Sequence, residues 1–294
     1  MGQCSPHLQP GRSHSPSEEP HSEHLTVAFG RRQLYRLVEL PGCDRWYALP
    51  NKRFAKLRLG SPTESSRRLT LKAQGSGLVG DPLLARFDKL YTAVVSDILD
   101  QLGLRHQVMA ASIRPLYREA RLAAYALTVK VAPVTSVPAK REDYYKGELL
   151  AIDSLQPGQA MVVSTADHCF WGELLSTAAR ARGGSGVILD GFTRDAKRVI
   201  DMAFPTFCRG IHAQDSLGRA DVAAINVPIE AGGVSVNPGD LLLADYDGVV
   251  VVPASAAAEV IALAEKKALD ENRVRPHLEQ GMSAAEMFKR YGVL

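Results

Sequence analysis

The stretch that decides the fold is residues 171–195, which begin with Trp-Gly-Glu-Leu-Leu and end with Gly-Val-Ile-Leu-Asp-Gly-Phe-Thr-Arg-Asp. The segment 172–182 predicts a helix that ends at 183–184, where two glycines can adopt the left-handed cap conformation. Apolar runs predict strands over 186–189 and, before the helix, over 160–164. If these strands are parallel, they form a right-handed βαβ unit with both strands finishing on the same sheet edge.

That edge would gather groups suited to a small anion and a metal, because ligands of such units bind outside the carboxyl ends of the strands. Backbone N–H groups at the helix start would suit a carboxylate. Arg194 offers a planar fork of donors that can stabilise developing negative charge, and Asp195 offers an oxygen ligand for a hard cation such as Mg²⁺. The alternative is an exposed ion pair worth at most about 1 kcal/mol, and spacing alone does not separate the two.

The rest of the chain alternates helical and strand patterns. Helical spacing covers 83–102, with a possible break at Thr92, and also 143–155 and 255–273, before Pro276. A capping box at Ser283 predicts a last helix over 283–291. Further strands are expected at 122–131, 204–208, 222–227, 233–236, 241–244 and 249–252. This arrangement predicts a layered α/β or α+β domain over residues 81–294.

Composition separates this domain from residues 1–80. The extension carries 12 Lys/Arg and 6 Asp/Glu, whereas residues 81–294 carry 23 and 26. Its first 25 residues are Ser-, Pro-, His- and Glu-rich, so we expect a basic and largely disordered extension. No apolar run is long enough for a membrane helix, and the N-terminus has no secretory h-region. We therefore expect a cytoplasmic protein with no membrane or nucleic-acid partner.

The other chemical candidates are weaker. Four scattered cysteines show no Cys-x-x-Cys spacing, and Cys169 and Cys208, near the predicted site, are interpreted as buried structural thiols. His168 and His212 are more simply read as polar loop residues than as proton shuttles. The glycines at 183–186 precede a strand rather than follow one, so they do not form a dinucleotide-binding fingerprint.

The spacing of the acidic and basic residues resembles a known family. Glu173 is followed after 20 residues by Arg194-Asp195, and supporting similarities lie at 95–100, 188–191, 233–240 and 245–249. The pattern is similar to the acidic-x20-Arg-Asp signature of the 4-hydroxy-4-methyl-2-oxoglutarate/4-carboxy-4-hydroxy-2-oxoadipate aldolases and the wider RraA-like family. The resemblance spans roughly residues 81–275.

This resemblance implies an α/β fold of the swivelling β/β/α (αββα) sandwich type, assembled as a homotrimer or hexamer with sites at subunit interfaces. It also implies a lyase, a class II aldolase that uses Mg²⁺ or Mn²⁺ to cleave a 4-hydroxy-2-oxo diacid to pyruvate and that also decarboxylates oxaloacetate. Carried over to this chain, Arg194 and the backbone of the helix start would bind the small 2-oxo acid, Asp195 would hold the metal, and Glu173 would act on a metal-bound water. The helix-start residues are Gly172, Glu173, Leu174 and Leu175.

The chain departs from the aldolase pattern just downstream of the Arg-Asp pair. Lys197 and Arg198 stand where the aldolases carry a further acidic residue, and the next acid is Asp201. Three hypotheses follow: a pyruvate-releasing aldolase, an oxaloacetate decarboxylase that uses the same enolate chemistry, and a non-catalytic RraA-like regulator that binds a ribonuclease. Retention of Glu173, Arg194 and Asp195 favours an enzyme.

Overall fold

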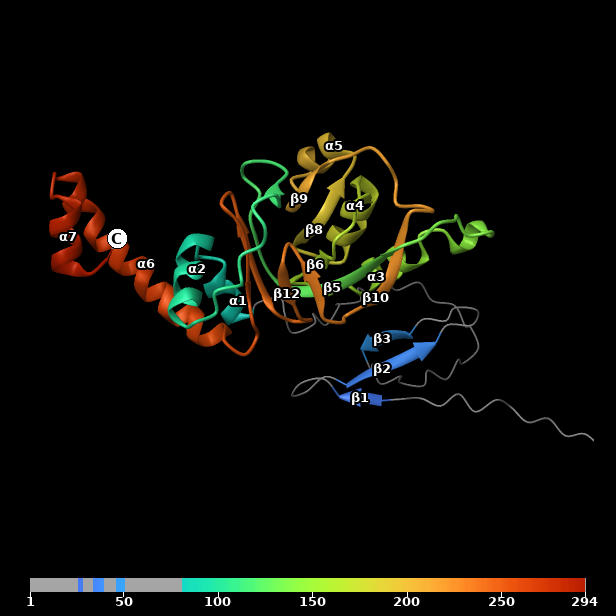
Figure 1. Ribbon diagram of the computed structural model, residues 1–294, viewed down its shortest axis with the longest axis horizontal. Helices are drawn as coiled ribbons and strands as arrows, with labels where there is room; N and C mark the ends of the chain where they lie inside the picture. The colour runs from blue at the N-terminus through green and yellow to red at the C-terminus, as the bar shows by residue number, and fades with distance from the viewer. Residues whose placement is uncertain (1–25, 29–33, 40–45, 51–80, 294) are drawn as a thin grey trace, which may run out of the picture.

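The computed structural model describes residues 26–28, 34–39, 46–50 and 81–293 (Figure 1). In the N-terminal extension it describes three strands, β1 (Thr26–Ala28), β2 (Leu34–Glu39) and β3 (Trp46–Pro50), which form an antiparallel sheet in the order β1-β2-β3. The expected disorder of the remaining residues before 81 concerns parts outside the described chain, so it stays a prediction.

A nine-stranded mixed sheet forms the centre of the main domain. Its path runs β14-β13-β5-β6-β8-β9-β4, with β10 paired to β5 and β7 paired to β8. The strands β5, β6, β8 and β9 are parallel neighbours, while β13, β14, β10 and β4 pair antiparallel. Their bounds are β4 (Arg114–Pro115), β5 (Leu122–Pro133), β6 (Gln159–Val163), β7 (Cys169–Trp171), β8 (Gly186–Thr193), β9 (Thr206–Ile211), β10 (Ala220–Ile225), β13 (Leu241–Asp245) and β14 (Gly248–Val252).

Layers cover both faces of this sheet, so the expected α/β class is confirmed. Along β8, Val187 and Leu189 pack into the core beneath α3 (Lys146–Ser154), α4 (Glu173–Ala181) and α5 (Ala196–Asp201), whereas Ile188 faces the opposite core. That second core includes the hairpin β11 (Ile229–Ala231) and β12 (Val234–Val236). The alternation is the period-two consequence of a strand buried on both sides.

Three helices build a third core against β13 and β14: α1 (Pro82–Phe87), α2 (Thr92–Gln101) and α6 (Ala257–Glu279). The predicted break in the first helical region is confirmed: both the N–H and the hydroxyl of Thr92 donate to the Asp245 carboxylate, at 2.9 and 2.6 Å. Asp97 lies within α2 and ion-pairs with Lys267 of α6 at 3.3 Å, so it caps no helix.

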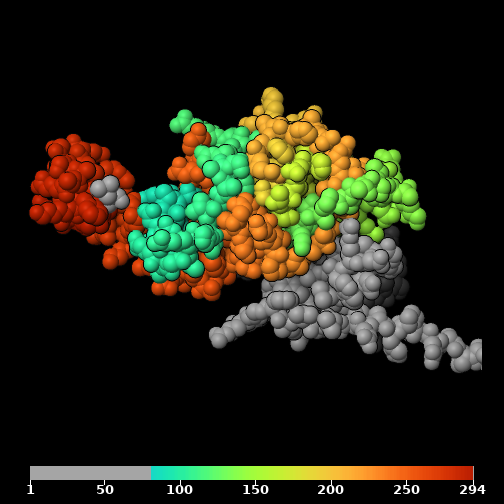
Figure 2. Space-filling model, in the orientation of Figure 1, coloured from blue at the N-terminus to red at the C-terminus, as the bar shows by residue number. Residues whose placement is uncertain are grey.

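The C-terminal helices form an arm that leaves the sheet, visible at the left of Figures 1 and 2. The prediction that the long helix ends before Pro276 is wrong, because α6 runs on to Glu279. Pro276 removes one helical hydrogen bond, but Asn272, whose carbonyl loses it, is exposed and stays hydrated. The last helix, α7 (Ala284–Tyr291), begins as predicted, with the Ser283 hydroxyl accepting from the Glu286 N–H at 3.2 Å.

The βαβ unit has one more strand than the sequence predicts. β6 and β8 are parallel neighbours, as predicted. The strand that leads directly into α4, however, is β7, whose three residues are too few to give a periodic signal. The helix α5 was also missed, since its six residues contain only two large apolar side chains, Val199 and Ile200.

Candidate active site

Two neighbouring parallel strands end at the candidate site. β7 passes through Gly172 into α4, and β8 is followed by Arg194 and Asp195. Trp171 lies opposite Thr193 in the register, and the Arg194 N–H donates to the Trp171 carbonyl at 2.9 Å. The helix start and the Arg-Asp pair therefore share one sheet edge, as the sequence predicts.

The Asp195 carboxylate lies against the start of α4. Its Oδ2 accepts from the Glu173 N–H at 3.3 Å, and a Cβ on Gly172 would come within 2.7 Å of the same oxygen. The Gly172 backbone is extended, so the closeness of this carboxylate, and not a left-handed conformation, requires glycine. Asp195 thus occupies one of the helix-start donors, and the free donors for a ligand are those of Leu174 and Leu175.

Asp195 itself has a left-handed backbone, with φ of 54°. Such a conformation costs a residue other than glycine on the order of 1–3 kcal/mol, and it is concentrated at functional sites. The residue directly precedes α5 and so fixes the turn from β8 into that helix. The Arg194-Asp195 pair lies in the short connection between β8 and α5, and Asp195 contacts the starts of both α4 and α5.

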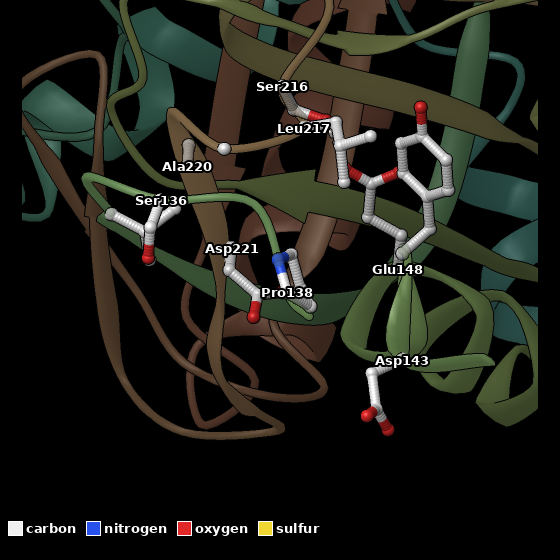
Figure 3. Close-up of a pocket in the computed structure, with 11 residues that line it drawn as sticks. Ser136, Pro138, Asp143, Glu148, Ser216, Leu217, Ala220 and Asp221 are labelled. Carbon is white, nitrogen blue, oxygen red and sulfur yellow. Dashed lines mark hydrogen bonds between the residues drawn. The ribbon is translucent and has the colours of Figure 1, made fainter. Parts of the chain in front are cut away.

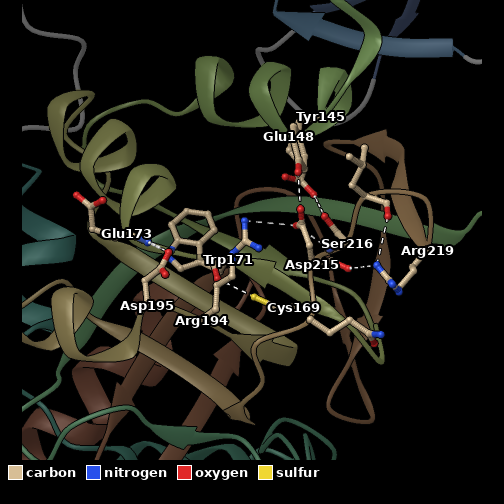
Figure 4. A network of polar contacts seen from close by, with 12 residues as sticks. Tyr145, Glu148, Cys169, Trp171, Glu173, Arg194, Asp195, Asp215, Ser216 and Arg219 are labelled. Carbon is tan, nitrogen blue, oxygen red and sulfur yellow. Dashed lines mark hydrogen bonds and ion pairs between the residues drawn. The ribbon is translucent and has the colours of Figure 1, made fainter. Parts of the chain in front are cut away.

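Arg194 belongs to a chain of polar contacts (Figure 4). Its Nη2 lies 3.5 Å from Asp215 Oδ1, and Asp215 also accepts a hydrogen bond from the Tyr145 hydroxyl. Burial and the Asp215 charge raise the pKa of Tyr145 to about 12, so the phenol remains a donor at neutral pH. Tyr145 also has a left-handed backbone, at the start of α3. Asp215 and Tyr145 therefore orient the guanidinium.

These groups line a cavity of about 200 Å³. Arg194 is its one cationic side chain among the described residues, and its carboxylates come from Glu148, Asp195 and Asp215. The Trp171 side chain in the cavity wall is held in place, because its indole N–H donates to the Ser176 hydroxyl at 2.7 Å. The other lining residues are Tyr145, Leu149, Cys169, Phe170, Trp171, Gly172, Leu174, Leu175 and Ser216.

Glu173 does not line this cavity; its backbone N–H is bonded to Asp195. The carboxylate Oε1 accepts from the Thr177 hydroxyl at 3.1 Å, one turn along α4, and Glu173 is absent from the cavity lining. Figure 4 shows its carboxylate pointing away from Arg194. The predicted catalytic role of Glu173 therefore stays a prediction, and in this conformation its side chain faces away from the arginine.

The residues downstream of the pair do not supply a further acid to the site. Lys197 pairs with Asp201 at 2.7 Å across one turn of α5, and both side chains are exposed. Asp201 is absent from the cavity lining. The acids that do lie there, Glu148 and Asp215, come from other parts of the chain.

The nearby cysteines and histidines do not contribute reactive side chains. Cys169 and Cys208 are buried free thiols, as predicted, and burial raises the pKa of each to about 11. A neutral thiol is a poor nucleophile. His168 and His212 lie outside the cavity lining.

Sequence reasoning missed four residues at the site: Tyr145, Glu148, Asp215 and Ser216. Glu148 falls inside a helix that is predicted from its apolar face, which gives no signal for an acid. Asp215 and Ser216 lie in a stretch without a periodic pattern. Only the tertiary fold brings them beside Arg194. The one local signal was the dense run of polar residues at 141–148, which is uncommon at the start of a buried helix.

The donor set fits a weakly coordinated divalent cation only. Within the described parts of the chain no group of three or more His, Cys, Asp and Glu side chains could hold a metal ion. Mg²⁺ commonly takes one or two protein carboxylates and keeps several waters, so Asp195, which lines the cavity, would supply one such carboxylate. A metal held by a full protein cage does not fit this site.

Comparison with known proteins identifies the family to which this chain belongs. The family model described as RraA-like, "Aldolase/RraA", matches residues 92–251, more than half of the chain. The protein therefore belongs to the RraA-like family. Within the described residues, no helix has the length and apolar character needed to cross a membrane.

Individual relatives agree with this assignment. A protein of Halalkalibacterium halodurans, provisionally named a 4-hydroxy-4-methyl-2-oxoglutarate aldolase, is 31% identical over 64% of this chain and 84% of its own. A solved but uncharacterised protein of Pseudomonas syringae has a TM-score of 0.61 at 30% identity, over 70% of this chain and 96% of its own. Streptomyces coelicolor RraAS2, titled an unusual member of the RNase ES inhibitor RraA protein family, has a TM-score of 0.60 at 29% identity. The match covers 69% of this chain and 100% of its own.

Proposed function

We propose that this protein is a divalent-metal-dependent class II aldolase that cleaves a 4-hydroxy-2-oxo diacid, such as 4-hydroxy-4-methyl-2-oxoglutarate, to pyruvate, and that it also decarboxylates oxaloacetate. Both reactions pass through the enolate of pyruvate, so one set of charge-stabilising groups serves both. The observation that carries the proposal is the convergence of Arg194, Asp195 and the start of α4 on one small cavity.

Each group has a distinct role in this reaction. The Arg194 guanidinium would bind the substrate at its 2-oxo end and stabilise the charge that develops on the enolate oxygen. The N–H groups of Leu174 and Leu175, at the positive end of the α4 dipole, would bind the carboxylate. Asp195 would hold Mg²⁺ or Mn²⁺, which when bound supplies Lewis-acid polarisation of the 2-oxo group. The apolar wall formed by Phe170 and Trp171 excludes water from this end.

A coupled assay for pyruvate tests the proposal. The purified protein is given 4-hydroxy-4-methyl-2-oxoglutarate or oxaloacetate, with Mg²⁺, with Mn²⁺ and with a chelator. We expect pyruvate from both substrates with either metal and none above background with the chelator. Absence of metal-dependent pyruvate from both substrates would contradict the proposal.

The structural likeness to an RNase-inhibitor family member supports a second candidate, a non-catalytic regulator that binds a ribonuclease. The regulator would produce no pyruvate and would slow a ribonuclease in a cleavage assay. Aldol cleavage to pyruvate without an effect on the ribonuclease would support the aldolase and contradict the regulator.

We also propose a homotrimer or hexamer. Leu149 and Leu174 lie at the cavity with 52% and 77% of their surface exposed, and a second copy could cover them. Light scattering coupled to gel filtration measures the mass; a monomer would contradict this.

A further inference from the structure

A buried acid of α3, Glu148, lines the cavity that also contains Arg194. Glu148 lies in the first turn of α3 and is only 6% exposed. Its Oε1 accepts a hydrogen bond from the Ser216 hydroxyl at 2.6 Å. Both residues line the cavity that holds Arg194. No lysine or arginine forms an ion pair with this carboxyl in the described chain.

Local packing holds Glu148 in this position. Gly147 lets α3 approach β10 closely, since a Cβ there would come within 2.5 Å of the Val222 Cβ. Tyr145 anchors the start of the helix through its bond to Asp215. These contacts fix the position of the helix from which the Glu148 side chain reaches Ser216.

Glu148 and Ser216 also line a second cavity of about 170 Å³ (Figure 3). Asp143, whose side chain is 42% exposed, lines this second cavity as well, so it reaches solvent. A volume of this size holds several waters. The Glu148-Ser216 pair thus lies between the Arg194 cavity and this second, solvent-reaching cavity.

The charges around Glu148 keep both of its protonation states accessible. Burial, together with the negative charges of Asp215 and Asp221, raises the pKa of its carboxyl to about 7. The Ser216 hydrogen bond and the Arg194 charge act in the opposite direction. These are the groups that face it from β10, from the loop after β9 and from the end of β8.

We propose that Glu148 is the proton source for the enolate, acting through the hydroxyl of Ser216. The inference rests on the proposed function and adds a step to it. Cleavage at C3 of the substrate leaves the pyruvate enolate, which becomes pyruvate only when C3 gains a proton. Neither Arg194, which carries a permanent charge, nor Asp195, which is to hold the metal, is suited to give that proton.

The step balances within these groups. The enolate C=C electron pair forms the new C–H bond at C3 with the Ser216 hydroxyl proton, while the C2 oxygen returns to a carbonyl. In the protonated state the Glu148 carboxyl donates to the Ser216 oxygen, the reverse of the bond that the ionised carboxylate accepts, so the Ser216 proton is released toward C3. The Glu148 proton then moves to the Ser216 oxygen in the same step, because a hydroxyl can accept and donate at once. Glu148 is left as a carboxylate, which takes a new proton from water in the second cavity.

The competing explanation is structural: Glu148 would only tie α3 to Ser216. Glu148→Gln separates the two, because glutamine keeps the size and the hydrogen bond but cannot supply a proton. Ser216→Ala tests the same path without altering the buried acid. Asp153→Asn is the matched control, since Asp153 is an exposed acid on the same helix, paired with Arg182 and outside both cavities.

The experiment follows hydrogen–deuterium exchange of the pyruvate methyl group in D₂O by proton NMR, with Mg²⁺ present, alongside aldol cleavage. We expect Glu148→Gln and Ser216→Ala to lose about 100-fold in exchange and in kcat, and Asp153→Asn to match the wild type. Binding of oxalate, which resembles the enolate, should keep its Kd in all three. Glu148→Asp should recover part of the exchange.

The pH profile gives a second readout. Cleavage needs Glu148 protonated, so wild-type kcat should fall as pH rises through about 7, and Glu148→Gln should lose that limb. Exchange and pH profile unchanged in Glu148→Gln, with cleavage intact in the wild type, would overturn this inference and leave the proposed function standing. A wild-type protein that neither exchanges nor cleaves would overturn both.

Discussion

Two pairs of an arginine and an aspartate lie at β8 in different surroundings: Asp190 with Arg209, and Arg194 with its sequence neighbour Asp195. Asp190, on the strand, is 8% exposed, and its Oδ2 accepts from the Gly232 N–H at 3.0 Å and from the Thr165 hydroxyl. Its Oδ1 lies 3.2 Å from Nε of Arg209. The pair after the strand, Arg194 and Asp195, lines an open cavity. Asp195 accepts a hydrogen bond from the Glu173 N–H, and Arg194 forms an ion pair with Asp215.

The comparison teaches that residue type does not separate a structural pair from a functional one. Asp190 joins β8 to β9 and to two loops, so its carboxylate is committed to holding the fold. Asp195 gives one oxygen to the start of α4, and Arg194 lines the cavity and forms an ion pair with Asp215. Several partners that hold the fold together mark the Asp190 carboxylate, and a position beside a cavity marks the second pair.

The largest effect should follow from changing the open pair. Arg194→Ala and Asp195→Ala should each lower kcat/KM by about 100- to 1,000-fold, since each removes charge stabilisation at the enolate, while thermal unfolding and oligomer mass stay close to wild type. Asp201→Asn, at the other end of α5, is the control and should keep full activity. Near-normal kcat/KM in either alanine variant would show that the site is elsewhere.

Changes to the pair of Asp190 and Arg209 should lower the free energy of unfolding instead of the activity. Asp190→Ala leaves Arg209 without its buried partner and should cost about 3 kcal/mol of unfolding free energy, measured by urea denaturation. Asp167, the exposed second partner of Arg209, gives the matched control: Asp167→Ala should cost less than about 1 kcal/mol. Equal losses in the two variants would remove the distinction between the pairs.

Glu148 should show a smaller effect on stability that depends on pH. Its pKa is about 7 in the folded chain against an ordinary 4.5, so between these values the folded state retains a proton that the unfolded state has released. Folding stability therefore falls as pH rises through this window. Glu148→Gln should be more stable than wild type by on the order of 1–3 kcal/mol at pH 8, with no gain below pH 4.5. Urea denaturation at both pH values measures it, and a gain that does not vary with pH would contradict it.

The smallest effect should come from the N-terminal extension. The described lining of the cavity contains no residue from 1–79, so deleting this segment should leave kcat/KM unchanged. A folded truncation with reduced kcat/KM in the coupled pyruvate assay would show that the extension takes part in the reaction.

Much of the fold could be predicted because burial leaves a local pattern. The apolar runs that became β6, β8, β13 and β14 gave their positions to within a few residues. β7 and α5 were missed, since three and six residues are too few to establish a period. The end of α6 was placed too early, because a proline near an exposed helix terminus costs less than one in a buried interior.

The sequence by itself determined the βαβ unit, the shared edge and the Arg194-Asp195 pair, because these depend on chain connectivity and strand periodicity. Only the tertiary structure decided which acids face Arg194. Asp215 and Glu148 lie 21 and 46 positions from it in sequence, and no local pattern links them. Tertiary packing also set Asp195 against the start of α4, since this contact joins residues 22 positions apart that meet only after folding.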